Sequence, residues 1–160
     1  MLNIRPATEA DVELILQFIR DLAEYEREPQ SAVGTREDIL RDGFRGNPKF
    51  RVLIAEWGGV PAGFAFYFFN YSTWLGKPGL FLEDLFVKPE LRGQGIGKAL
   101  LAELAKIALA ENCYGVKWEV LDWNQPAIDF YEKLGAKLRK EWITVRITGE
   151  PLEELAALRR

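Results

Sequence analysis

The chain has 160 residues, of which 48% are hydrophobic and 28% charged, so length and composition favour one folded domain and exclude a disordered chain. It contains no histidine and a single cysteine, Cys113, which excludes histidine-based catalysis, disulfide bonds and zinc sites built from several cysteines, and no motif indicates any other metal site. The net charge of −3 argues against nucleic acid as a partner and suits a cationic substrate. The lack of disulfides, of a secretory signal and of a membrane-length apolar run predicts a cytoplasmic protein without a membrane segment.

The first half of the chain predicts a strand, two helices and three further strands. Thr8 with Asp11, and Thr35 with Asp38, have the spacing of capping boxes, so each pair marks the start of a helix. After Asp11, apolar residues recur every three or four positions up to a break near Pro29, as on an amphipathic helix. Strands are expected at 2–5, 50–57, 60–71 and 80–88, with a hairpin turn at 58–59 and a break in the chain at 78–79.

The second half of the chain predicts helices that alternate with strands. The expected order is a helix after a glycine-rich turn at 92–97, a strand at 115–121, a helix that Asn124 caps and Gly135 ends, a strand at 137–148 and a helical turn at 151–158. Because hairpins are mixed with helical crossovers, residues 1–160 are expected to form one α+β domain in which helices cover the faces of a mixed sheet.

The glycine-rich turn reads Arg92-Gly93-Gln94-Gly95-Ile96-Gly97 and lies between a predicted strand and a predicted helix. Free N–H groups at a helix N-terminus, approached through glycines without a Cβ, can bind a pyrophosphate. A dinucleotide-binding turn would need glycine where Lys98 stands, and a Walker A loop would need serine or threonine where Ala99 stands. An ordinary tight turn remains the alternative interpretation.

The remaining pattern, R-x-x-G-x-G, resembles the coenzyme A signature of the GNAT N-acetyltransferase superfamily. Residues 124–135 are similar to a second stretch of that superfamily, N-x-x-A-x-x-F-Y-x-K-x-G, and the order of elements also matches. Residues 71–74, 82–84 and 121–124 resemble the diamine acetyltransferase branch, in particular its thialysine N-epsilon-acetyltransferase-like members. The resemblance implies a mostly antiparallel mixed sheet of six or seven strands with helices on both faces, and acetyl-CoA as co-substrate.

The resemblance also implies where acetyl-CoA binds. Pantetheine is expected to pair with residues 85–87 like an added strand, with the Leu85 N–H toward the thioester oxygen. The pyrophosphate is expected on the glycine turn, and Asn124 near the arm of the cofactor, although Asn124 has an alternative role as a helix cap. The implied cofactor-binding residues are Leu85, Phe86, Val87, Arg92, Gly93, Gln94, Gly95, Ile96, Gly97, Lys98, Asn124, Pro126 and Ala127.

Acetyl transfer to an amine needs a base and a proton donor for the leaving thiolate. Without histidine, Glu83 is the expected base, with binding of a cationic substrate as its alternative role, and Tyr131 is the expected acid, with a place in the core as its alternative. Tyr25, Glu26, Glu83 and Trp74 are the implied substrate-binding residues. The acidic residues around Tyr25 could instead form only a solvated helix face.

The expected reaction is acetyl transfer to the primary amine of a small cation, such as a diamine, thialysine or a lysine-like molecule. Polyamine-specific members carry an acidic residue where Ser72 stands, which favours the smaller substrates. The resemblance also implies a homodimer with the C-terminal strand region at its interface. The alternatives are a catalytically silent acyl-CoA-binding module and an enzyme for long polyamines or a protein amine.

Overall fold

The computed structural model describes residues 1–159 and divides into two compact units, Met1–Leu121 and the residues from Asp122 onward. The first unit contains the whole sheet: β1 (Leu2–Pro6), β2 (Arg51–Trp57), β3 (Val60–Ser72), β4 (Lys77–Val87) and β5 (Val116–Trp118). It also contains the helices α1 (Val12–Tyr25), α2 (Arg36–Ile39) and α3 (Ile96–Ala110), with short helical turns at Glu9–Asp11, Pro29–Ser31, Leu40–Phe44 and Pro89–Leu91. The second unit contains α4 (Gln125–Lys133) and α5 (Gly149–Ala156).

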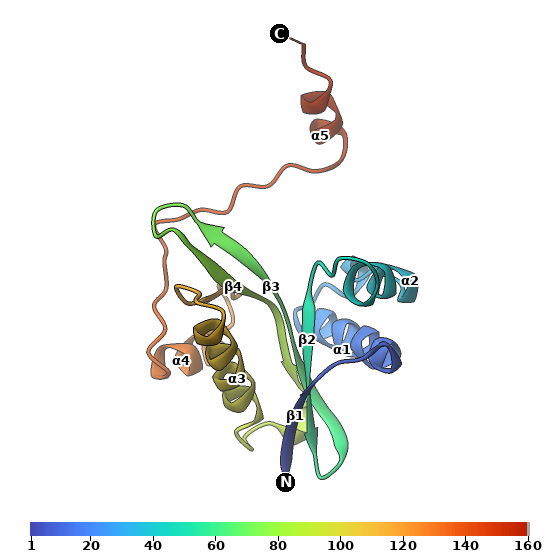
Figure 1. Cartoon of the computed structure of the whole chain (residues 1–160), viewed down its shortest axis with the longest axis vertical. Coiled ribbons are helices and arrows are strands. Elements are labelled where there is room, and N and C mark those ends of the chain that lie inside the picture. Colours follow the sequence, from blue (N-terminus) through green and yellow to red (C-terminus); the bar gives the residue numbers. More distant parts are fainter. Residues whose placement is uncertain (160) are drawn as a thin grey trace. The chain divides into compact units, whose positions relative to one another are not determined.

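The sheet has the order β1-β2-β3-β4-β5, in which neighbours are antiparallel except for the parallel pair β4–β5. Within the first unit, α1 and α2 lie on one face of the sheet and α3 on the other (Figure 1). This confirms the predicted mixed sheet with helices on both faces. The described residues form five strands rather than the six or seven expected.

Aromatic side chains fill the space between α1 and the sheet. Phe18 of α1 is fully buried, and its ring lies 5.3 Å from that of Phe64 in β3 and 5.9 Å from that of Phe86 in β4. Phe64 and Phe86 are cross-strand partners, so this cluster holds α1 over the middle of the sheet. The C-terminal end of α1 therefore reaches the C-terminal end of β4.

A β-bulge interrupts β4 at Glu83. Phe66 of β3 pairs with Asp84, and the next residue, Tyr67, pairs with Leu82, which leaves Glu83 without a cross-strand partner. An extra residue shifts the alternation of side chains beyond it. Asp84 therefore shares the α1 face with Phe66, whereas uninterrupted alternation would have put it on the α3 face beside Leu82.

The expected break at Pro78-Gly79 is wrong, because both residues belong to β4 and pair with Tyr71 and Asn70. The Leu80 N–H donates to Gly115 on the β5 side, so the nitrogen of Pro78, two residues earlier, faces the same side. Since β5 begins opposite Leu80, the missing N–H of Pro78 costs no ladder hydrogen bond.

The expected strand at 137–148 is also wrong, since this segment of the second unit has no regular structure. Three of its apolar side chains are strongly exposed: Trp142 to 64%, Ile143 to 83% and Val145 to 91%. A strand needs a neighbour for its hydrogen bonds, and none pairs with this segment within the described residues. The expected helical turn at 151–158 is present as α5.

Candidate active site

The edge of β4 that faces β5 is unpaired over its last five residues. The two strands pair only from Leu80 to Leu82, and in the part of the chain that the structure describes no strand follows β4 beyond that point. The Lys88 N–H donates to Ala62 across β3. Because successive N–H groups alternate sides, the N–H groups of Leu85 and Val87 point to the open edge. The expected pantetheine strand and the expected Leu85 donor both need this geometry.

The glycine turn places the N-terminus of α3 just beyond this edge. Gly93 and Gly95 have φ angles of 81° and 80°, which only glycine adopts readily, and Gly95 is the N-cap of α3. The first N–H groups of the helix have no carbonyl partner within it and carry the positive end of its dipole. Gly97 and the exposed Lys98 lie in this first turn, so the site suits a diphosphate.

Arg92 connects the glycine turn to α1. Its Nε–H donates to the Val87 carbonyl at 2.9 Å, and its guanidinium lies 4.8 Å from the centre of the Tyr25 ring and 5.6 Å from that of Phe86. A cation over an aromatic face is attracted by the ring. Residues expected separately at the cofactor and at the substrate, Arg92 and Tyr25, therefore contact each other.

Three carboxyl groups are electrostatically coupled near the middle of β4. Burial, with the charges of Glu83 and Glu26, raises the pKa of Asp84 from 3.8 to about 7. Burial and the charge of Glu83 also raise the pKa of Glu26. Asp84 was not among the expected site residues. The sequence does carry a signal for the changed face of Asp84. Leu80, Leu82 and Leu85 are spaced by two and then by three residues, which breaks the strand period of two.

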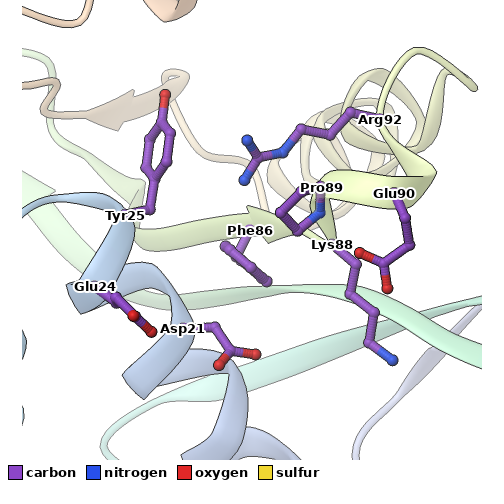
Figure 2. Close-up of a pocket in the computed structure, with 8 residues that line it drawn as sticks. All are labelled: Asp21, Glu24, Tyr25, Phe86, Lys88, Pro89, Glu90 and Arg92. Carbon is purple, nitrogen blue, oxygen red and sulfur yellow. The ribbon is translucent and has the colours of Figure 1, made fainter.

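An open cavity of about 410 Å³ lies between the C-terminal end of α1 and the end of β4 (Figure 2). Its lining residues are Asp21, Glu24, Tyr25, Phe86, Lys88, Pro89, Glu90 and Arg92. Of the expected substrate residues, Tyr25 lines this cavity. Trp74 does not: it lies in the turn between β3 and β4, at the opposite end of β4, and is 88% exposed.

The remaining expected site residues belong to α4 of the second unit. Asn124 is buried, and its Oδ1 accepts the Ala127 N–H at 3.4 Å, which confirms its role as helix cap. Pro126 lies in the first turn, where its missing N–H costs nothing. Tyr131 is half-buried beside Phe130, with 5.5 Å between the ring centres. That these residues contact or act on the cofactor remains a prediction.

Comparison with known proteins gives the family of the chain. The acetyltransferase (GNAT) family profile matches residues 15–136. The chain belongs to the GNAT acetyltransferase family. It is 42% identical over 164 residues to thialysine N-epsilon-acetyltransferase of Sus scrofa, covering 96% of both chains. It is 43% identical over 99 residues to L-ornithine N5-acetyltransferase of Arabidopsis thaliana, which is 62% of this chain and 43% of the relative. An integron cassette protein from the mobile metagenome of V. cholerae has the same fold, with a TM-score of 0.82, 26% identity and 98% of each chain covered.

The protein is thus an acetyl-CoA-dependent amine N-acetyltransferase, and its first unit carries a GNAT sheet. In this GNAT enzyme the open β4 edge, the carboxyl groups of Glu83 and Asp84 and the glycine turn lie along one strand and the connection that follows it, while Glu26 comes from the end of α1. Within residues 1–159, no cluster of cysteine and carboxylate side chains is arranged to hold a metal ion. No helix of the described chain has the length and apolar character needed to cross a membrane.

Proposed function

We propose that this acetyltransferase acetylates the primary amine of a small cation, such as a diamine, thialysine or a lysine-like molecule, by direct attack of the amine on the thioester of acetyl-CoA. The observation that carries the proposal is the unpaired β4 edge, which runs from the bulged Glu83 to the glycine turn. The names of the relatives support the substrate class, since thialysine and ornithine both carry a side-chain amine.

The open edge would supply the binding groups for acetyl-CoA. Its Leu85 N–H is a fixed donor for an oxygen that gains negative charge, which is a large electrostatic contribution in acyl transfer. Gly93, Gly95 and Gly97 let the chain approach a diphosphate, and the start of α3 attracts its charge. Acetyl-CoA supplies the activated acetyl group as a thioester.

Glu83 would receive the proton of the incoming ammonium, whose pKa of about 10.4 keeps it charged at neutral pH. The bulge leaves Glu83 without a cross-strand neighbour and its side chain exposed, so a substrate can reach the carboxylate directly or through a water. Coupled carboxyl groups of Glu26 and Asp84 would hold the cation nearby. Tyr131, whose phenolic hydroxyl is a hydrogen-bond donor, would protonate the departing thiolate.

The proposal extends to the assembly and its compartment. A homodimer would cover the exposed apolar residues Trp142, Ile143 and Val145 of the C-terminal region. The single, buried Cys113 suits a reducing cytoplasm. No metal takes part in the proposed reaction.

The test is release of coenzyme A thiol from acetyl-CoA in the presence of a panel of amines. The panel contains thialysine, L-lysine, L-ornithine, putrescine, cadaverine and spermidine. Turnover is expected with one or more of the small amines and little with spermidine. Tight acetyl-CoA binding without turnover of any amine would overturn the proposal and indicate a silent binding module.

A further inference from the structure

Arg92 lies against aromatic rings although carboxylates line the same cavity. Its guanidinium carbon is 4.8 Å from the centre of the Tyr25 ring, at the end of α1, and 5.6 Å from that of Phe86 in β4 (Figure 2). Asp21 and Glu24 of α1 also line this cavity, yet Arg92 takes part in no ion pair in the described part of the chain. The charge of Arg92 is therefore available to an anion that is not part of the protein.

Two of the contacts of Arg92 come from β4. Its Nε–H donates to the Val87 carbonyl at 2.9 Å, which fixes the base of the guanidinium at the end of the strand. The Phe86 ring is buried and packs against Phe18 of α1, with 5.9 Å between the ring centres, so it belongs to the core. These contacts leave the terminal nitrogens, Nη1 and Nη2, for the oxygens of a phosphate group, which a guanidinium binds through two parallel hydrogen bonds.

Tyr25 supplies the third contact, from a different element. It is the last residue of α1 and its side chain is 39% exposed, so its ring contributes less to the core than the ring of Phe86. The face of an aromatic ring attracts a guanidinium, and Tyr25 follows directly after Glu24 and one helical turn after Asp21. The ring is thus placed to compete with these two carboxylates for Arg92.

We infer that Tyr25 is a positioning residue for the acetyl-CoA site, because its ring holds the Arg92 guanidinium at the start of the glycine turn with its terminal nitrogens available to the diphosphate. The inference rests on the proposed placement of acetyl-CoA at this turn. It adds a contribution from α1 to those of β4 and the turn. Without the ring, Asp21 and Glu24 would compete with the diphosphate for the same cation.

The experiment measures binding of coenzyme A to the full chain by calorimetry, with no amine present. Tyr25→Leu should raise the Kd for coenzyme A about twofold to fivefold, the usual effect of a cation–ring contact at an exposed site. Tyr25→Phe keeps the ring and should bind like the wild-type protein. Tyr71→Leu is the matched control, since Tyr71 is 64% exposed and pairs with Pro78, at the far end of β4 from the glycine turn. An unchanged Kd in Tyr25→Leu, or an equal loss in Tyr25→Phe, would overturn the inference.

A double-mutant cycle tests whether Tyr25 acts through Arg92. Arg92→Gln alone should raise the Kd for coenzyme A about tenfold, the usual effect of losing a hydrogen bond to a charged group. Adding Tyr25→Leu to Arg92→Gln should raise the Kd no further, because the side chain that Tyr25 positions is already absent. Additive effects would overturn the inference, since Tyr25 would then act on the cofactor independently of Arg92.

Stability distinguishes positioning from a structural role. The melting temperature of Tyr25→Leu should stay within about 2 °C of that of the wild-type protein, as for most substitutions at the surface. A weaker binding of coenzyme A that appears only with a large fall in melting temperature would overturn the inference.

The same measurements separate the inference from the proposed function. If Arg92→Gln and Gly97→Ala both bind coenzyme A like the wild-type protein, the proposed placement of the cofactor fails and the inference fails with it. If these two variants lose affinity and Tyr25→Leu does not, the placement stands and only the inference fails. If the binding results are as expected but no amine is acetylated, the proposed function fails and the inference stands.

Discussion

Asp84 shows how a single inserted residue changes the chemistry of a strand. The bulge at Glu83 places Asp84 on the α1 face, half-buried and opposite Phe66. A carboxylate loses hydration there and is repelled by Glu83 and Glu26, which is why its pKa rises to about 7. The protein therefore holds a carboxyl group that gains or loses its charge near neutral pH.

The raised pKa of Asp84 makes the stability of the protein depend on pH. Because its pKa is about 7 in the folded state and 3.8 when unperturbed, the folded state binds the proton more tightly, and stability falls as the pH rises from about 4 to about 7. Asp84→Asn should therefore raise the free energy of unfolding at pH 8, by up to about 4 kcal/mol, and with it the melting temperature. Near pH 4 the substitution should change both little. Thermal unfolding at the two pH values measures this. A similar effect of Asp84→Asn at both, or the same pH dependence in the exposed control Asp122→Asn, would contradict the prediction.

Substitution of Gly97 can distinguish a role in cofactor binding from a role in folding. A Cβ added to Gly97 would meet only Val87 Cγ2, at an ordinary contact distance of 3.8 Å, and its φ lies outside the left-handed region. Gly97→Ala should leave the melting temperature unchanged or slightly higher, because alanine favours helix. If a diphosphate approaches this turn, KM for acetyl-CoA should rise about tenfold, the cost of one hydrogen bond to a charged group. Gly95→Ala is the contrasting control, since φ of 80° there strains alanine and lowers stability as well. An unchanged KM in Gly97→Ala would argue against the cofactor role.

At the scale of elements, two similar capping boxes have different importance. Asp38 accepts the Thr35 N–H at 2.8 Å on an exposed helix start. Asp11 accepts the Thr8 N–H at 2.7 Å, is buried, and also binds both terminal nitrogens of Arg5, at 2.8 and 2.9 Å. The capping box of Thr8 and Asp11 therefore connects β1 to the start of α1.

This difference predicts unequal costs for the same substitution. Asp38→Ala should lower the free energy of unfolding by about 1 kcal/mol, the usual value of a cap. Asp11→Ala should lower it by about 3 kcal/mol, because it leaves the half-buried Arg5 guanidinium without its main partner. Urea unfolding of the two variants measures the difference. Equal losses would show that the Arg5 pair adds nothing to the cap.

The divergence of β5 from β4 is the element-scale feature on which the proposed cofactor site depends. The two strands pair over Leu80–Leu82, after which β4 continues alone to the glycine turn. Parallel neighbours that diverge leave N–H groups, here those of Leu85 and Val87, available to a ligand. The proposed site therefore depends on where the pairing of β4 with β5 stops rather than on an unusual side chain.

At the scale of the whole molecule, the exposed residues of the C-terminal region predict an assembly. Sedimentation should give a mass twice 18.3 kDa, because a second copy would cover Trp142, Ile143 and Val145. The double variant Ile143→Glu with Val145→Glu should sediment at 18.3 kDa. Lys137→Glu, an exposed charge change in the same segment, should leave the dimer intact. A monomeric wild-type protein at micromolar concentration would contradict the prediction.

The local signals in the sequence were reliable where neighbouring residues carry the interaction. Thr35 with Asp38 forms the expected capping box, Asn124 caps α4, and Gly135, with φ of 95°, follows the end of that helix. The Pro78-Gly79 break and the strand at 137–148 were wrong because strand formation depends on partners distant in the chain. Asp84 was not among the expected site residues, because the face that it occupies depends on the bulge at Glu83, which only the pairing with β3 reveals.

The sequence by itself determined the family and the chemistry it can perform: a glycine turn without the dinucleotide or Walker A residues, no histidine, and carboxylates with a tyrosine as the remaining proton carriers. These features depend on residue type and short spacing, which a chain displays before it folds. Only the tertiary structure decided that β4 separates from β5, that Asp84 shares a face with α1, and that Arg92 lies over Tyr25 beside unpaired charges. Each of these depends on strand register and helix packing, which bring together groups that no local pattern relates.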